Sequence, residues 1–210
     1  MGSARQNGLH VDANVEETNM ADLVELHGRC GTHFASLVSG ITSDQWHDPT
    51  PCTDWDVRTL VHHLVYEQRW APPLLNGKTV DEIGDQYEGD LMGDDASTWP
   101  KLLSSSIDEG HAVVAQPGAL TRTVHLSYAD VTGEEYVMQL TADLAIHGWD
   151  LARGTGQDDT LDPDAVALIL PWAEANAELL AGSGMFGTRV DVGADARDDV
   201  RLLALLGRRA

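Results

Sequence analysis

Apolar residues recur at spacings of three and four along several long stretches of this chain, which is the period of an α-helix. Capping residues, glycines and prolines mark where each helix is expected to begin and end. Four helices of this length joined by loops imply an all-α, antiparallel four-helix bundle. The pattern predicts helices over residues 17–39, from a cap at Thr53 or Asp54 to just before Pro72, from Ser97 to just before Pro117, and from Glu134 to near Gly154.

The segments between these helices carry weaker signals. Residues 76–98 are rich in Gly and Asp and lack a sustained period, so we expect a mobile acidic surface loop or lid. Residues 121–131 alternate apolar and polar positions, which predicts a short β-arm. Asp162 followed by Pro163 is typical of a helix start, and Pro171 would interrupt or kink that helix. The C-terminal tail is expected to form an extended arm and a terminal amphipathic turn.

Length and charge narrow the class of protein. The 210 residues suffice for one domain, which we expect over residues 17–210 after a loose polar segment at residues 1–16. The formal net charge is −21 and no cluster of Lys and Arg offers a surface for phosphates, which argues against nucleic acid and anionic membranes as partners. No apolar run approaches the ~18 to 20 residues of a membrane span. We therefore expect a cytoplasmic protein, a monomer or homodimer, that acts on a small molecule.

The helix expected over residues 134–154 places ionisable groups on its apolar side. At about 100° per residue, Leu140, Leu144 and Leu151 fall in one narrow arc. The same arc contains His147, with Asp143 just off its edge. Burying two such groups without partners costs several kcal/mol, so the fold must supply a partner. Side chains four residues apart on a helix can ligate one metal ion, and they can equally form a buried Asp–His hydrogen bond.

Other histidines and tryptophans are less constrained. His62 and His63 lie on opposite edges of the apolar stripe of the second helix, so only one of them can join a given site. Periodicity does not choose between the two. His27 lies on the apolar face of the first helix, where we expect a core histidine. Trp55 and Trp149 are expected to pack the bundle. Cys30 and Cys52 form no CxxC motif and are expected to be small buried residues.

Three stretches of the sequence carry a resemblance: TPCTDWDVRTLVHHL at 50–64, TADLAIHGWDLARGTGQ at 141–157, and the ending FG...RLLALLGRR. As a set they resemble the single-domain actinobacterial relatives of the N-terminal domain of mycothiol-dependent maleylpyruvate isomerase, within the DinB-like superfamily. The resemblance implies a DinB-like four-helix bundle, to which the sequence pattern adds a short β-arm and a C-terminal helical extension. It also implies a divalent metal at one end of the bundle core.

Carried onto this sequence, the resemblance implies the metal ligands His63, Asp143 and His147, and the metal becomes the partner that the buried pair requires. The maleylpyruvate isomerases have Glu where this chain has Asp143, whose shorter side chain must bring its helix closer or bind through water. Three protein ligands leave an open position, as in catalytic sites. Zn²⁺ suits this donor set, and Ni²⁺ would also bind it.

Two further residues are candidates for catalysis. Asp150 follows His147 by three residues and can accept a hydrogen bond from the imidazole, or form an ion pair with Arg153 on a solvated face. Glu67 lies one helical turn beyond His63 and is a candidate base or extra ligand. The plainer interpretation of Glu67 is a solvated glutamate.

The leading hypothesis is a metal-dependent enzyme of the thiol-transferase or isomerase type, because a metal with an open position lowers the pKa of a bound thiol or water. The resemblance implies mycothiol as a cosubstrate that would add to a small electrophile. Neither cysteine lies near the expected ligands in the motifs, so the thiol is expected to come from this cosubstrate. The alternatives are a metal-dependent hydrolase, cyclase or rearrangement enzyme that uses no thiol, and a non-catalytic protein that binds metal or senses a ligand.

Overall fold

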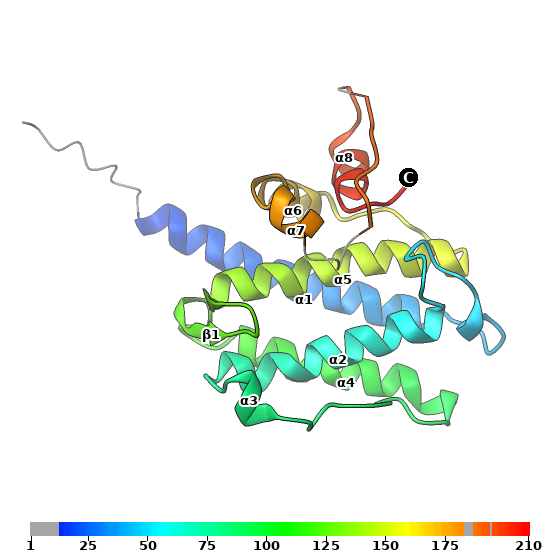
Figure 1. Cartoon of the computed structure of the whole chain (residues 1–210), viewed down its shortest axis with the longest axis horizontal. Helices are drawn as coiled ribbons and strands as arrows, with labels where there is room; N and C mark the ends of the chain where they lie inside the picture. The colour runs from blue at the N-terminus through cyan, green and yellow to red at the C-terminus, as the bar shows by residue number, and fades with distance from the viewer. Residues whose placement is uncertain (1–12, 183–186, 194) are drawn as a thin grey trace, which may run out of the picture.

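Four long helices form a bundle in the computed structural model, which describes residues 13–182, 187–193 and 195–210. The bundle consists of α1 (Ala13–Ser39), α2 (Val57–Leu75), α4 (Trp99–Val114) and α5 (Gly133–Thr155) (Figure 1). The all-α bundle expected from the sequence is confirmed. The remaining elements are α3 (Val80–Ile83), β1 (Thr123–His125), β2 (Asp130–Thr132), α6 (Pro163–Ala175), α7 (Ala177–Gly182) and α8 (Asp198–Leu205), with 3-10 turns at Gln45–His47, Ala96–Thr98 and Ala119–Thr121.

The first helix agrees with its prediction at one end. It ends at Ser39, as its apolar period indicates, and begins at Ala13, four residues before the expected start at residue 17. The expected loose segment at residues 1–16 therefore overlaps the helix at its last residues, and residues 1–12 lie outside the described residues.

The cap of α2 differs from the prediction. Asp56 caps the helix, because its Oδ1 accepts a hydrogen bond from the backbone N–H of Thr59 at 2.8 Å. Thr53 and Asp54, the expected caps, lie in the turn that precedes it. The sequence offers three capping residues within four positions, and only the geometry of the preceding turn decides which of them is used.

The end of α2 also differs, because the helix continues through Pro72 and Pro73 to Leu75. A proline inside a helix removes a donor and crowds the preceding turn. Here both prolines lie in the last turn, and the carbonyl of Pro72 still accepts from the N–H of Asn76 at 3.1 Å. Burial of Leu75, which is fully inaccessible to solvent, holds this turn against the core. The expected stop before Pro72 is therefore wrong.

The direction of the helices depends on the connection between α2 and α4. The Arg58 guanidinium lies 4.9 Å from the Trp99 ring centroid at the start of both helices, and further along Arg69 Nε donates to Ser106 Oγ at 3.3 Å. The two helices therefore run parallel, and the segment that joins them crosses the length of the bundle (Figure 1). The bundle is thus not antiparallel throughout, although α2 and α5 are antiparallel neighbours.

This crossing segment, residues 76–98, is held by local structure and by contacts with the bundle. Thr79 and Glu82 form a capping box that begins α3. Arg58 Nη2 pairs with Asp90 Oδ2 at 2.7 Å, and Met92 is buried at 4% exposure. The segment therefore has local structure and anchoring contacts that its lack of a sustained period does not indicate, and its mobility stays a prediction.

The β-arm and the fifth predicted helix are present. The strands β1 and β2 pair antiparallel with Val124 opposite Val131. Asp162 caps α6 by accepting from the N–H of Asp164, as its position before a proline indicates. Pro171 does not interrupt this helix, which continues to Ala175.

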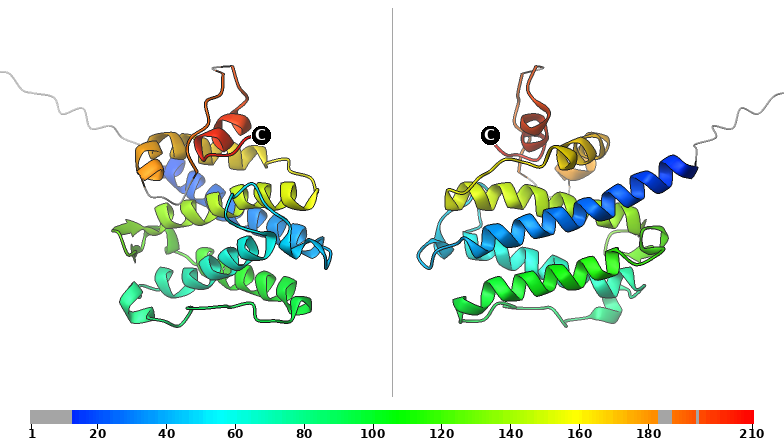
Figure 2. Two further views of the ribbon diagram at one scale, coloured as in Figure 1. Left: turned by 45° about the vertical axis from the view of Figure 1, so that its right-hand side comes forward. Right: turned by 180° about the vertical axis from the view of Figure 1, so that it is seen from behind.

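The C-terminal helices cover one side of the bundle. In Figures 1 and 2, α6, α7 and α8 lie on the side of α5 that faces away from α2 and α4. Within this extension α6 packs against α8, and it also contacts α1 and α5. Among the helices that the structure describes, none combines the length and apolar character needed to cross a membrane.

Candidate functional site

The candidate site lies where α2 and α5 pack antiparallel to each other. The apolar stripe of α5 is buried as predicted, with Leu140, Leu144 and Leu151 at most 2% exposed. His147 lies in the same stripe at 5% exposure, and the Asp143 side chain is 20% exposed. The position of these two groups follows from the helical period alone.

Three side chains that the sequence analysis singled out converge here. His63 Nε2 lies 2.8 Å from Asp143 Oδ2, and His147 Nε2 lies 3.4 Å from Asp143 Oδ1. One potential ligand atom of each residue lies within 4.8 Å of those of the other two. Each oxygen of a single carboxylate thus faces one imidazole. The structure brings the three residues together, and their role as metal ligands stays a prediction.

The two neighbouring histidines of α2 separate in space. His62 Nε2 accepts a hydrogen bond from the N–H of Leu91 at 3.2 Å and so faces the crossing segment. His63 faces α5 instead. Periodicity leaves this choice open because both residues flank the buried stripe, and the structure places His63 in the site.

A chain of contacts extends from the far side of the His147 ring. His147 Nδ1 donates to Asp150 Oδ2 at 3.0 Å, and Asp150 is fully buried. Arg208 Nη2 donates to the same oxygen at 2.7 Å. The alternative of a solvated Asp150–Arg153 pair is wrong, because Arg153 pairs with Asp159 at 3.0 Å. Asp150 therefore holds the imidazole in a fixed orientation.

Arg208 is one of the residues of this site that periodicity could not find. It lies near the C-terminus, is 5% exposed, and reaches the site across α5. The only signal in the sequence is its place in the ending RLLALLGRR. Its Nη1 also donates to the carbonyl of Leu206 at 2.7 Å, which fixes the guanidinium against the buried carboxylate.

The three convergent groups strongly affect each other's ionisation. Burial alone would raise the pKa of the Asp143 carboxyl, but His63 and His147 hold it well below its usual range. Burial alone would lower the pKa of His147, but the Asp143 carboxylate raises it to about 9. Without a metal the cluster therefore holds a carboxylate and a protonated imidazole, and a cation would take the place of protons between the same atoms.

Glu67 borders this cluster and is not the solvated glutamate of the plainer interpretation. The residue is half-buried on α2, one turn beyond His63. Burial, and then the negative charge of Asp143, raise the pKa of Glu67 to about 7. Such a group exchanges a proton near neutral pH, which suits a general base.

Trp55 forms one wall of the site. Its ring centroid lies 4.7 Å from that of His63 and 5.3 Å from that of His147. The residue is only half-buried, so its ring separates the two imidazoles from solvent on this side. Trp149, in contrast, is 4% exposed and packs in the core as expected. The prediction for Trp55 is incomplete, since it contacts site residues as well as the bundle.

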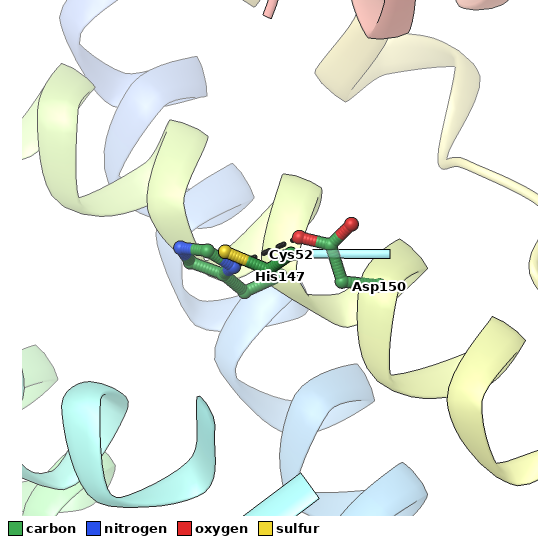
Figure 3. Close-up of side chains that lie close together, drawn as sticks. All are labelled: Cys52, His147 and Asp150. Atoms are coloured by element: carbon green, nitrogen blue, oxygen red, sulfur yellow. Dashed lines mark hydrogen bonds and ion pairs between the residues drawn. The ribbon is translucent and has the colours of Figure 1, made fainter. Parts of the chain in front are cut away.

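Cys52 lies beside the site, contrary to the expectation that neither cysteine is near it. Its Sγ belongs to a second group of potential ligand atoms, with His147 and Asp150, whose members lie within 4.8 Å of one another (Figure 3). Cys52 is half-buried, whereas Cys30 is buried at 5% exposure in α1. Burial raises the pKa of the Cys52 thiol. The loop before α2 brings it here, and no spacing motif indicates this.

The donor set fits a divalent cation. Nitrogen and oxygen ligands of a tetrahedral zinc site lie about 3.3 to 3.6 Å apart, given bond lengths of about 2.0 to 2.2 Å. Around Asp143 the contact of 3.4 Å matches this separation and the contact of 2.8 Å is shorter than it, so small shifts would admit an ion. His147 is already held at Nδ1 and presents Nε2, as histidine ligands usually do.

Comparisons with known proteins show the family to which this chain is related. The family described as the mycothiol maleylpyruvate isomerase N-terminal domain matches residues 27–152, a range that includes the three convergent residues. Two uncharacterized proteins of Mycobacterium tuberculosis, from strains CDC 1551 / Oshkosh and ATCC 25618 / H37Rv, are each 30% identical to this chain over 158 residues. These matches cover 73% of this chain and 79% of each relative.

Solved structures with a similar fold belong to the same group of proteins. Crystal structures of a mycothiol-dependent maleylpyruvate isomerase and of a histidine-to-alanine mutant of it superpose with TM-scores of 0.60 and 0.61. Sequence identity is 14% and 13%, and each match covers 81% of this chain and 75% of the other. At this identity the likeness concerns the fold, which is DinB-like as the sequence indicates.

Proposed function

Because this chain belongs to the family of the mycothiol maleylpyruvate isomerase N-terminal domain, we propose that it is a metal-dependent enzyme whose cation is held by His63, Asp143 and His147. The observation that carries this proposal is the convergence of two imidazole Nε2 atoms on the two oxygens of one carboxylate. The three ligands come from two packed helices, so the site is built on rigid elements.

Zn²⁺ is the cation that two imidazoles and one carboxylate suit best, and Ni²⁺ is the second candidate. When bound with an open position, such a cation lowers the pKa of a thiol or water placed there. Asp143 is shorter than the glutamate of the isomerases, so ligation requires α2 and α5 to approach closely. The 2.8 Å contact between Asp143 and His63 supports direct ligation.

Asp150 and Arg208 act as positioning residues for His147. Asp150 accepts from Nδ1 and thereby leaves Nε2 available to a cation. Arg208 offsets the charge of the buried carboxylate, and together with His147 it lowers the pKa of Asp150 although burial alone would raise it. Asp150 thus stays ionised and keeps the ring from rotating.

Glu67 is the proposed base. A small thiol that binds beside the cluster would give its S–H proton to the Glu67 carboxylate. The sulfur would form a bond to an electrophilic carbon of the second substrate as the π bond at that carbon opens, and the electron pair of that π bond would take the proton back from Glu67. A pKa near 7 allows Glu67 to accept the proton and to return it to the product. Mycothiol is the proposed thiol, since the similar solved structures are of a mycothiol-dependent enzyme.

Cobalt substitution tests the site and the thiol together. We expect Co²⁺-loaded wild-type protein to develop a thiolate-to-cobalt charge-transfer band when mycothiol is added. His147→Ala should bind no cobalt and show no band, while His62→Ala should behave as wild type because His62 faces the crossing segment.

The other outcomes of this experiment distinguish the competing functions. Turnover of a small substrate by the metal-loaded protein without any thiol would replace thiol chemistry with hydrolysis or rearrangement. The site would be structural if it bound cobalt but left no coordination position open to exchange, and if removal of the metal strongly lowered the melting temperature. Absence of cobalt binding in the wild type would contradict the proposal as a whole.

A further inference from the structure

His147 is shared by two groups of potential ligands, and only one of them is used by the proposed function. Cys52, His147 and Asp150 each offer an atom within 4.8 Å of those of the others, and they face the Nδ1 side of the imidazole (Figure 3). His63 and Asp143 face the Nε2 side. The two groups therefore address different edges of the same ring.

We propose that Cys52, His147 Nδ1 and Asp150 form a second binding position, for a thiophilic divalent ion such as Cd²⁺ or excess Zn²⁺, next to the first. The proposal needs only these three side chains and goes beyond the proposed function. A sulfur, a nitrogen and an oxygen donor are a set that zinc-like ions accept, and the thiolate selects soft ions over hard ones.

The ion would take the place of the proton in the hydrogen bond that His147 donates to Asp150. His147 Nδ1 and Asp150 Oδ2 lie 3.0 Å apart around one N–H. An ion at this place displaces that proton and the thiol proton of Cys52, and both protons go to solvent. Arg208 donates to Oδ2 through Nη2 at 2.7 Å and Nε at 3.3 Å, and the ion would displace these contacts while the guanidinium stays on Oδ1, which Nε contacts at 3.2 Å. The fully buried carboxylate is therefore not left without its counter-charge.

Cys52 is placed for this role by a tight turn. The Cys52 N–H donates to Thr50 Oγ1 at 3.2 Å, and its carbonyl accepts from the Trp55 N–H at 2.8 Å. This turn fixes the thiol beside the ring, and its partial exposure leaves a path for the ion from solvent.

An ion bound at the second position should weaken metal binding at the first position. This consequence rests on the proposed function. An ion at Nδ1 removes the hydrogen bond by which Asp150 orients His147, and two cations on one ring repel each other. Ions at the two positions should therefore weaken each other's binding by the same factor. The protein would lose its primary metal, or its activity, in the presence of thiophilic ions.

A cadmium titration tests the second position, because a cadmium–thiolate bond has a charge-transfer absorption in the ultraviolet that nitrogen and oxygen ligands lack. We expect wild-type protein to develop this absorption with about one thiolate-bound ion per chain. Cys52→Ser should lose it. Cys30→Ser is the matched control and should retain it, because Cys30 is buried on α1 away from this group.

His63→Ala and Asp143→Asn separate this proposal from the proposed function. Both variants should retain the cadmium–thiolate absorption, since neither residue belongs to the second group. Loss of the absorption in a folded variant of either kind would make Cys52 a fourth ligand of the first site and overturn the proposal. Absence of the cadmium–thiolate absorption from the wild type, or its persistence in Cys52→Ser, would also overturn the proposal. Antagonism is measured as a decrease of about tenfold in Co²⁺ affinity with cadmium present, in wild type but not in Cys52→Ser.

Discussion

At the residue scale, Asp143 decides whether the metal is held by three protein ligands or by two. Asp143→Asn keeps the shape of the side chain but removes its charge, so we expect metal affinity to fall by about tenfold or more. The fold should survive, because the apolar stripe of α5 does not depend on this residue. Isothermal calorimetry during a metal titration measures the change in affinity, with His147→Ala as the reference for a lost ligand.

A different result for Asp143→Asn would change its assignment. Wild-type affinity combined with reduced turnover would place Asp143 beside the ligands, where it orients His63 or a bound water. Wild-type affinity and turnover together would remove it from the site. Its present contacts with both imidazoles favour ligation over either outcome.

The adjacent histidines of α2 give a second test at this scale. His63→Ala should abolish metal binding, because the residue supplies one of three ligands. His62→Ala should keep most of the affinity, because its ring contacts Leu91 of the crossing segment. Metal content after dialysis, measured on protein without a histidine tag, compares the two. If the ranking were reversed, the assignment of the ligand in α2 would be off by one residue.

The residues of the site differ in how far the sequence could predict them. Asp143 and His147 lie on one helix, so the period alone places them together. His63 needed the family resemblance, since the period leaves His62 as an equal candidate. Cys52, Trp55 and Arg208 reach the site from a turn and from the C-terminus, and no local pattern encodes contacts between segments so far apart in the chain.

At the scale of elements, the contact between α1 and α4 contains a histidine pair. His27 is fully buried, which confirms the expected core histidine, and its Nδ1 lies 3.1 Å from that of His111. The two rings are stacked with their centroids 5.4 Å apart. One ring must donate and the other accept, which two neutral imidazoles can do and two imidazolium ions cannot.

This pair predicts a loss of stability in mild acid. Burial, and then the proximity of His111, lower the pKa of His27 to about 3, against about 6.5 in an unfolded chain. Between these values the unfolded state binds the proton and the folded state does not, so stability falls as the pH decreases below about 6.5. The contribution is about 1.4 kcal/mol per pH unit, or about 2 kcal/mol at pH 5.

Denaturant unfolding at pH 7 and pH 5 measures this effect. His27→Leu removes the titrating group, so its free energy of unfolding should fall less with pH than that of the wild type. His33→Ala, at an exposed position of the same helix, is the control and should keep the wild-type dependence. Equal pH dependence in His27→Leu and wild type would show that the pair is not what makes the fold acid-sensitive.

The elements also show what periodicity can and cannot predict. The extents of α4 and α5 follow from apolar spacing within two residues, because helices bury one face. The parallel orientation of α2 and α4 does not follow, because spacing along a helix carries no information about its direction relative to a distant one. The long crossing segment determines that direction, and its anchoring residues are too few to form a periodic pattern.

At the scale of the whole molecule, the C-terminal extension is joined to the candidate site by one buried ion pair. Arg208 comes from the end of the extension, and Asp150 belongs to α5. The side chains are 4% and 0% exposed, so neither charge can be solvated if the other is lost. The extension thereby contributes to the orientation of His147, although it supplies no proposed ligand.

Arg208→Gln should therefore affect both stability and metal binding. Breaking a buried ion pair by removing one partner costs about 3 to 5 kcal/mol, because it leaves an uncompensated charge. Without Arg208, Asp150 lacks the hydrogen bonds from Nε and Nη2 and holds the imidazole less firmly, so metal affinity should fall by about tenfold. Chemical unfolding and metal titration measure the two effects. Arg153→Gln is the control for lost positive charge, because Arg153 lies on α5 and pairs with Asp159 at an exposed position. A variant that loses stability but binds metal as tightly as wild type would show that the extension supports only the fold, and that Asp150 positions His147 without help from Arg208.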